Sequence, residues 1–380
     1  MKHIVIIGGG FAGVAAAKSA AAKLSDVETK ITLIEKRSFF FHSIGSLRAM
    51  VDTSFIPKVC IPFDNIFKDC KNAEIKFASV ESIEYEDRTV TFTPNTGNNQ
   101  ETISYDYLII STGSSYPSPI KPSEKFSIQE DIEREMTATA KNIKNSERIL
   151  VLGGGAVGIE MAGELKSYYP EKKIMLLDPH DELLSNQNVP KLRKPANQAL
   201  LNIGVEVILG QRLKEQFSSH QFGTKSLVTE AGLTIESDAQ LICFGMKPNS
   251  NLMKDPECLD GNFIKVKPTM QVDHSSAKYE NVFVIGDASN HPTPKMAYWA
   301  AEQGKHLAEC ISANIRNGKE IQPYMGPSTE ALFVPLGPSG GVGQLPLFSG
   351  VVVGNFLVKM MKSKDLFTGM YWKELNAEMP

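Results

Sequence analysis

The feature that most constrains this chain is a unit that occurs twice: a buried strand, a glycine-rich loop, a helix, and a second strand that ends in an acid. The first copy spans residues 4–35 and has the loop sequence GGGFAG at residues 8–13. The second copy spans residues 149–178 and has the loop sequence GGGAVG at residues 153–158. A strand, a G-x-G-x-x-G loop and a helix in this order form the fingerprint of a dinucleotide-binding unit. The repeat predicts that one chain binds two dinucleotides, most economically one flavin and one nicotinamide.

Each part of the unit has a physical task. Gly8 allows the tight turn, Gly10 leaves room for a pyrophosphate beside the backbone, and Gly13 lets the helix pack close to the strand. The helix N-terminus offers free N–H groups and a partial positive charge to the phosphates. Glu35 and Asp178 end the second strands, where a carboxylate accepts hydrogen bonds from ribose hydroxyls.

Composition narrows the classes of function. A chain of 380 residues suits two or three domains. Its net charge of −3 argues against a nucleic-acid partner, because such proteins usually carry a basic surface. The five cysteines are odd in number and include no Cys-x-x-Cys pair, so we expect neither a disulfide framework nor a metal site. They are Cys60, Cys70, Cys243, Cys258 and Cys310.

Further strand patterns complete the predicted architecture. Apolar runs closed by glycine occur at residues 106–113, 241–245 and 281–287, and alternation over residues 80–99 predicts an antiparallel meander with a turn at 96–99. The expected fold class is α/β, with two Rossmann-like dinucleotide-binding domains of the glutathione-reductase-like kind and a C-terminal α+β segment.

These elements in this order resemble the two-dinucleotide-binding flavoprotein reductases. That family includes glutathione-reductase-like enzymes, type II NADH dehydrogenases and apoptosis-inducing factors. The resemblance implies that the first loop holds FAD and the second holds NAD(P)H. It implies a discontinuous FAD-binding domain at residues 1–115 and 263–325, an NAD(P)H-binding domain at 116–262, and a C-terminal segment at 326–380.

The resemblance also implies roles for single residues. Gly286 and Asp287 would bind the flavin ribityl chain, while Arg48 and Val80 would also touch FAD. The full set of expected cofactor-binding residues is Gly8, Gly9, Gly10, Phe11, Ala12, Gly13, Glu35, Arg48, Val80, Thr112, Gly113, Gly153, Gly155, Gly158, Asp178, Gly286, Asp287, Met296 and Ala297.

Asp178 bears on which nicotinamide cofactor is used. A carboxylate beside the adenosine ribose repels a 2′-phosphate, and the neighbouring Pro179 and His180 add no arginine to offset it. We therefore expect NADH to be preferred, with NADPH as the weaker cofactor.

Four segments are similar to a quinone-reducing branch of the family, the mitochondrion-associated apoptosis-inducing-factor homologues. They are residues 41–49, 293–298, 341–344 and 362–367. This resemblance implies NAD(P)H-dependent reduction of a ubiquinone-type acceptor. Disulfide reductases of the family need a redox cysteine pair after the first unit, but residues 39–47 contain no cysteine and have Ser43 near the expected position. We therefore expect electrons to pass from the flavin to the acceptor without a thiol relay.

Three side chains are candidate catalytic residues. Glu160 follows the second loop and could either interact with the helix dipole or lie beside the nicotinamide and flavin. Lys295 lies after Thr293 and Pro294, where we expect a helix to begin and to face the flavin pyrimidine end. It could equally be a surface charge. Lys362 could neutralise a developing oxyanion or be a solvated lysine of the tail.

Several questions stay open from the sequence. Residues 351–362 mix apolar side chains with lysines, which suits either a core helix or contact with a membrane or lipid droplet. The chain begins directly with a strand and has no long apolar run, so we expect a cytoplasmic protein without a signal peptide, transit peptide, transmembrane span or N-myristoylation site. Monomer and homodimer are both open. An NADH oxidase, a reductase of a small protein and a signalling flavoprotein remain alternative functions.

Overall fold

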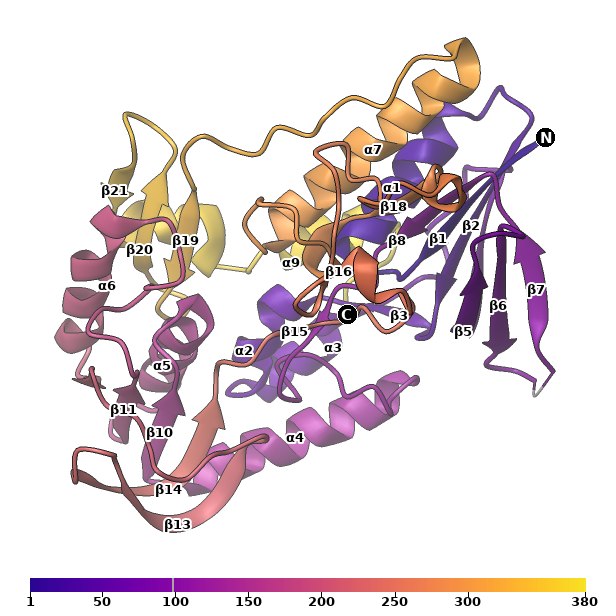
Figure 1. Cartoon of the computed structure of the whole chain (residues 1–380). Helices are drawn as coiled ribbons and strands as arrows, with labels where there is room; N and C mark the ends of the chain where they lie inside the picture. Colours follow the sequence, from indigo (N-terminus) through magenta and orange to yellow (C-terminus); the bar gives the residue numbers. More distant parts are fainter. Residues whose placement is uncertain (98) are drawn as a thin grey trace.

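The computed structural model describes residues 1–97 and 99–380, and it is built on two sheets, each with parallel central strands and antiparallel pairing at one edge (Figure 1). The first sheet has seven strands in the order β18-β8-β1-β2-β5-β6-β7. Their bounds are β1 (Lys2–Ile7), β2 (Thr29–Glu35), β5 (Ala73–Glu84), β6 (Thr89–Pro94), β7 (Glu101–Ser104), β8 (Tyr107–Ile110) and β18 (Val282–Val284). Helices α1 (Phe11–Lys23) and α7 (Ala297–Asn317) pack together beside this sheet.

The pairing within this sheet follows the sequence patterns. Strand β1 pairs in parallel with β2 and β8. Its residues 4–7 are buried and apolar, as is typical of a central parallel strand that is covered on both faces. Strands β5, β6 and β7 form the predicted antiparallel meander. Of the turn predicted at residues 96–99, Asn98 lies outside the described residues.

The second sheet has five strands in the order β12-β11-β10-β14-β13. Its strands are β10 (Arg148–Leu152), β11 (Lys173–Leu177), β12 (Glu206–Ile208), β13 (Gln221–Val228) and β14 (Thr234–Ile242). Its helices are α4 (Gln129–Asn145), α5 (Ala156–Tyr168) and α6 (Pro190–Asn202). The fold class is thus confirmed: each glycine loop joins a central parallel strand to a helix, as in a Rossmann unit.

Short elements join the two sheets. Strands β9 (Ser114–Ser115) and β15 (Lys247–Pro248) pair where the chain crosses from one sheet to the other and back. The remaining short elements of this part are β3 (Phe39–Phe41), β4 (Cys60–Pro62), α2 (Ser46–Ala49), α3 (Ile56–Val59), β16 (Leu259–Asp260) and β17 (Phe263–Ile264). The domain boundaries given above stay a prediction, although each sheet falls within its predicted range.

The C-terminal segment is α+β, as expected. It contains the antiparallel strands β19 (Leu332–Pro335), β20 (Gly341–Leu345) and β21 (Val351–Val353), then α8 (Asn355–Val358), a π-helical turn at Lys359–Ser363, and α9 (Thr368–Glu374). The interpretation of residues 351–362 as one core helix is wrong. Val351 and Val352 belong to a strand, and Phe356 and Met360 are exposed.

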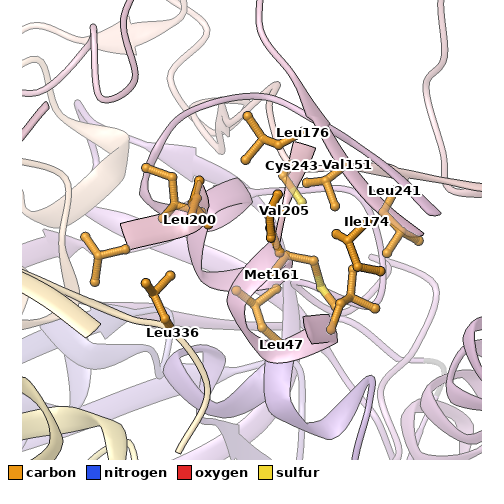
Figure 2. Close-up of a cluster of buried hydrophobic side chains, with 14 of the residues drawn as sticks. Leu47, Val151, Met161, Ile174, Leu176, Leu200, Val205, Leu241, Cys243 and Leu336 are labelled. Atoms are coloured by element: carbon orange, nitrogen blue, oxygen red, sulfur yellow. The ribbon is translucent and has the colours of Figure 1, made fainter. Parts of the chain in front are cut away.

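This segment also joins the two sheet units. Figure 2 shows a core in which Leu47 of α2 and Leu336 of the C-terminal segment join Met161 of α5. Tyr371 and Trp372 of α9 pack into a different core with α1 of the first unit. Because one core draws on several segments, the two dinucleotide-binding units are held in a defined relation.

Helix α7 begins later than predicted. The expected start was at Thr293 and Pro294, but the first helical residue is Ala297. Met296 keeps an extended backbone, with φ −135° and ψ 148°. Lys295 Nζ donates to the carbonyl oxygens of Ser289 and His291, both at 2.8 Å, and these bonds hold the preceding residues as a loop.

Candidate active site

Both glycine loops open onto one cleft of about 2100 Å³. It is lined by the ends of the central strands in both sheets and by the C-terminal segment. In open α/β sheets ligands bind outside the carboxyl ends of the strands, which is where this cleft lies. Of the predicted cofactor-binding residues that the structure describes, all line the cleft except Gly13, Arg48 and Gly158.

The first loop has the geometry that a pyrophosphate needs. Gly10 is the N-cap of α1, and a Cβ added there would meet nothing within 4 Å. A Cβ on Gly13 would overlap the carbonyl oxygen of Gly8, so that glycine serves the packing of helix against strand. Gly8 has φ +101°, a conformation that other residues rarely adopt. The N–H groups at the start of α1 therefore face open space in the cleft.

The second loop repeats this arrangement. A Cβ on Gly155 would again meet nothing within 4 Å, and one on Gly158 would overlap the carbonyl oxygen of Gly153. Gly155 is the N-cap of α5. Two equivalent anion-binding helix ends thus open onto the same cleft, as two bound dinucleotides require.

The two strand-end acids brace the loops beside them. Glu35 Oε2 accepts a hydrogen bond from the Gly9 amide at 2.5 Å, and Asp178 Oδ2 accepts one from the Gly154 amide at 2.5 Å. Both side chains also line the cleft. Each carboxylate oxygen has two lone pairs, so this role is compatible with the predicted ribose contacts.

The fold places Arg212 and Lys214 in the same cleft as Asp178, which the sequence reasoning missed. His180 Nδ1 lies 2.7 Å from Asp178 Oδ1. The Gln211 amide donates to the Asp178 carbonyl oxygen, and the next residues, Arg212 and Lys214, line the cleft. They are distant from Asp178 in sequence and become neighbours only because β12 lies beside β11. The preference for NADH stays a prediction, because Arg212 and Lys214 carry positive charges in this cleft that would attract the 2′-phosphate of NADPH.

Asp287 follows β18 closely in the chain and lines the cleft. Its Oδ2 accepts from Ser114 Oγ at 2.6 Å and lies 3.2 Å from Lys121 Nζ. Burial alone would raise the pKa of Asp287, but Lys121 and Ser114 hold this pKa below its usual value. Asp287 is therefore ionised at neutral pH and fixed in orientation. Val80, Thr112, Gly113, Gly286, Met296 and Ala297 line the same cleft.

Lys295 lines the cleft, but its ammonium is already hydrogen-bonded to two backbone carbonyls. Burial lowers the pKa of Lys295 to about 8, against the opposing effect of Asp287. The surface-charge interpretation of Lys295 does not fit a half-buried amine. Its role toward a flavin stays a prediction.

Glu160 and Lys362 meet in the cleft although 202 residues separate them. Lys362 Nζ lies 2.8 Å from Glu160 Oε1 and also donates to the carbonyl oxygen of Phe333 at 3.0 Å. Only 15% of the Lys362 side chain and 13% of the Glu160 side chain are exposed. Burial raises the pKa of Glu160, an effect that Lys362 opposes. Lys362 is thus not a freely solvated lysine of the tail.

Arg48 lies behind the cleft wall. Its guanidinium pairs with Glu164 through Nε at 3.1 Å and Nη2 at 2.8 Å, and Nη1 donates to the Lys364 carbonyl oxygen at 3.2 Å. Arg48 and Glu164 are each 2% exposed. The side chain of Arg48 is thus occupied by protein partners, and the expected contact with FAD stays a prediction.

The cysteines are arranged as packing residues. Burial raises the pKa of Cys60 to about 12 and also raises the pKa values of Cys243 and Cys258. All five are free thiols, and Cys243 is the one that lines the cleft among the residues described. It is 3% exposed and lies under Gly153. A thiol kept in its protonated form is a poor nucleophile.

An aromatic group closes the cleft on the side of α9. Phe11 contacts Phe40 and Tyr371 with ring centroids 4.9 and 5.0 Å apart, and Tyr371 stacks on Phe40 at 5.7 Å. Tyr371 lines the cleft together with Phe367 and Met370. The sequence motifs did not indicate the α9 residues, because no local spacing shows that the chain end returns to the first loop.

One group away from the cleft has ligand atoms within 4.8 Å of one another: Asp255, Cys258 and His274. The ring nitrogens of His274 are engaged, since Nδ1 accepts from the Ser276 amide and Nε2 lies 3.2 Å from Glu257 Oε2. The hydrogen bonds of this group are thus satisfied by the chain itself.

The fold and the cleft together define a class: an oxidoreductase that brings two dinucleotides to one cleft. Residues 2–304 match the family described as pyridine nucleotide-disulphide oxidoreductase, and the chain belongs to this family. This membership confirms the expected cofactor classes, a pyridine nucleotide and FAD.

Relatives of this chain align over its whole length. The ferroptosis suppressor protein 1 of Mus musculus and that of Homo sapiens are each 31% identical over 386 residues, covering 100% of this chain and 97% of the relative. Apoptosis-inducing factor homolog B of Dictyostelium discoideum is 30% identical over 404 residues, covering 100% and 98%. The predicted resemblance to apoptosis-inducing-factor homologues is thus confirmed.

Solved structures share the fold. The sulfide:quinone oxidoreductase of Aquifex aeolicus has a TM-score of 0.76 at 17% identity, covering 100% of this chain and 92% of that one. The water-forming NADH oxidase of Lactobacillus brevis has a TM-score of 0.65 at 21% identity, covering 90% and 75%. Among the described residues, we find no helix with the length and apolar character needed to cross a bilayer.

Proposed function

We propose that this protein is an FAD-dependent NAD(P)H:quinone oxidoreductase, which uses NADH as donor and a ubiquinone-type acceptor. The observation that carries this proposal is the Glu160–Lys362 ion pair, placed in the cleft that both glycine loops share. The relatives named ferroptosis suppressor protein 1 support the same branch of the family.

The residues present fit an FAD in the first loop. The open space over Gly10 suits its pyrophosphate, Glu35 its ribose, and Asp287 the chain between phosphate and ring. The second loop and Asp178 fit the nicotinamide dinucleotide in the same way. When bound, FAD supplies hydride acceptance from NADH and two-electron transfer to the acceptor.

Glu160 and Lys362 provide charge and protons at the reacting end. Reduction of a quinone to a quinol by NADH takes up one further proton, because the hydride supplies the two electrons and the other hydrogen. Lys362 Nζ can donate a hydrogen bond to a developing oxyanion, and Glu160, with its raised pKa, can hold a proton for transfer. Phe333 fixes the ammonium through its carbonyl oxygen, which limits the motion that would otherwise weaken this contact.

The cleft wall suits an apolar acceptor. Met361, Phe367 and Met370 line it on the side of the C-terminal segment. The thiols offer no alternative route, because burial raises the pKa of Cys60, Cys243 and Cys258. Direct transfer to a flat oxidant needs only access to the flavin.

We propose that the same segment contacts a membrane or lipid-droplet surface. Its exposed apolar side chains include Leu347, Phe348, Val351, Val352, Phe356, Met360, Met361 and Met370. Phe348 is 91% exposed. Lys359 and Lys364 are also exposed and lie close in sequence to Met360 and Met361. Apolar side chains with nearby lysines suit an anionic bilayer or lipid-droplet surface, where lipophilic quinones reside. Flotation with vesicles that contain phosphatidylserine should recover the wild type and lose Phe348→Ser/Phe356→Ser.

The function is tested by purification, an absorbance spectrum, and stopped-flow reoxidation of the NADH-reduced protein. We expect one FAD per chain and faster reoxidation by a short-chain ubiquinone than by oxygen or ferredoxin. Faster reoxidation by oxygen would indicate an NADH oxidase, and faster reoxidation by ferredoxin a small-protein reductase. A protein that binds FAD but is not reduced by NADH would refute the enzyme assignment and favour a signalling flavoprotein.

A further inference from the structure

Four buried charges form one network across three segments of the chain. Glu160 and Glu164 are four residues apart on α5, so their side chains lie on the same face. Lys362 pairs with Glu160 at 2.8 Å, and Arg48 of α2 pairs with Glu164 at 2.8 and 3.1 Å. The network contains two positive and two negative groups, so its formal charges cancel.

Arg48 also holds the backbone that carries Lys362. Its Nη1 donates to the carbonyl oxygen of Lys364, two residues beyond Lys362. Arg48 of α2 therefore binds both α5 and the C-terminal segment, with Nε, Nη1 and Nη2 all engaged. Arginine suits this task because its planar fork binds a carboxylate through two parallel bonds.

We infer that Arg48 and Glu164 are a positioning pair that keeps Lys362 in contact with Glu160. This inference rests on the proposed roles of Glu160 and Lys362. Without Arg48, Glu164 would be a buried carboxylate without its partner, on the same helix face as Glu160, and would compete with Glu160 for Lys362. With Arg48 in place, Glu164 is neutralised, and the ammonium of Lys362 stays at the end of α5 that faces the cleft.

The same network determines how Glu160 titrates. The charged and titratable groups that face Glu160 and Glu164 are Lys362, Arg48, Asp52 and Tyr168. Lys362 and Arg48 both lower the pKa of Glu160, whereas burial raises it. Loss of Arg48 therefore moves the pKa of Glu160 upward. Loss of Glu164 moves it downward, since a like charge disappears and a cation is freed.

The test uses the FAD-loaded protein after reduction by NADH and follows its reoxidation by a short-chain ubiquinone over pH. Glu160→Gln identifies the limb of the pH profile that belongs to Glu160. We expect Arg48→Met to slow reoxidation about tenfold and to move this limb up by about one pH unit. Glu164→Met should move the limb down. The double variant Arg48→Met/Glu164→Met should return the limb to its wild-type position, because Lys362 again has one carboxylate to pair with.

FAD affinity and thermal unfolding supply readouts that do not depend on activity. A positioning pair predicts unchanged FAD affinity in the double variant. If both the single and the double variant lose FAD, Arg48 is a flavin ligand and the inference is wrong. If the limb does not move in Arg48→Met or Glu164→Met, the pair is only structural. Should Arg48→Met fail to fold, Glu164→Met and the double variant still decide the question.

A matched control lies away from the cleft. Arg148 and Asp238 form a two-bonded pair at 2.8 and 3.2 Å, and neither residue lines the cleft. Arg148→Met should lower stability without moving the pH limb. A wild type that binds no FAD, or is not reduced by NADH, would refute the proposed function. Normal wild-type reduction and reoxidation with unshifted variants would refute only the positioning pair.

Discussion

At the scale of single residues, the chemistry depends on side chains that the chain must bring together from far apart. Lys362 reaches Glu160 across the cleft, and Asp178 shares its surroundings with Arg212 and Lys214. Lys362, Glu160 and Asp178 are largely buried, so water screens their charges less than it would at the surface. Two predictions belong to this scale.

Lys362→Ala should lower quinone turnover strongly. A charge positioned at a developing oxyanion is typically worth about 2 to 4 kcal/mol of barrier, or roughly 30- to 1000-fold in rate. Steady-state kinetics with a short-chain ubiquinone measure the effect, at matched FAD content. Lys373→Ala, which alters an exposed lysine of α9, is the control and should leave turnover unchanged. Unchanged quinone kinetics in flavin-replete Lys362→Ala would reduce Lys362 to a structural residue.

Asp178→Ala should narrow the gap between NADH and NADPH. The carboxylate repels a 2′-phosphate, whereas Arg212 and Lys214 remain to attract it, so we expect a shift of about tenfold in the ratio of kcat/KM values. Arg212→Ala should shift the ratio in the opposite direction. Equal efficiency with both cofactors in the wild type would show that Asp178 does not discriminate between them.

At the scale of elements, the glycine loops separate two kinds of requirement. We expect Gly10 and Gly155 to be needed for cofactor binding, since a Cβ there would meet no atom of the chain and would instead take up space meant for the cofactor. Gly13 and Gly158 are needed for the packing of helix on strand, since a Cβ there would overlap a carbonyl oxygen. The same fingerprint therefore contains binding glycines and folding glycines.

Gly10→Val should yield a folded protein that purifies without its yellow colour. The valine side chain would occupy the space predicted for the FAD pyrophosphate, and its Cβ would meet no atom of the chain within 4 Å. Absorbance at the flavin band and circular dichroism report occupancy and fold separately. Gly97→Val also adds a side chain in open space, but in the loop after β6, and should keep its FAD. Full occupancy in Gly10→Val would show that the first loop is assigned wrongly.

At the scale of the whole molecule, one cleft depends on three segments that pack through shared cores. Leu47, Met161 and Leu336 belong to one core, and Tyr371 joins α9 to another core with α1. Cys60, Cys243, Cys258 and Cys310 are buried, and burial raises the pKa values of the Cys60 and Cys243 thiols.

Replacement of all five cysteines by Ser or Ala should therefore lower stability more than activity. The buried thiols are small apolar groups, and their loss leaves cavities or buried hydroxyls. Turnover per bound FAD should stay near that of the wild type. Loss of quinone reduction in a folded, flavin-loaded variant would instead restore the thiol relay and exclude the mechanism proposed here.

Stability should fall as the pH drops below neutrality. Burial lowers the pKa values of His42 and His220 to about 4, so the unfolded chain takes up their protons first as the pH falls below 6.5. Each buried histidine then costs on the order of 3 kcal/mol between pH 6.5 and 4. Denaturant titrations at several pH values measure this loss. His42→Gln/His220→Gln should flatten the dependence, and an unchanged slope would contradict the assignment.

Short-range patterns decided much of what could be predicted. The strand–loop–helix units and the meander follow from apolar periodicity and glycine spacing, which are properties of neighbouring residues. The start of α7 was predicted wrongly, because the hydrogen bonds of Lys295 to Ser289 and His291 compete with helix formation there. The core-helix interpretation of residues 351–362 was wrong because apolar composition does not reveal which face of a segment remains exposed.

The amino-acid sequence alone thus determined the class of fold, the two dinucleotide loops and the family. Each of these depends on residues that lie close together in the chain. Only the tertiary structure decided that Lys362 meets Glu160 and that Arg48 pairs with Glu164. These contacts join residues far apart in sequence, and such a pair forms only when the packing of whole sheets and helices brings the two side chains within a few ångströms.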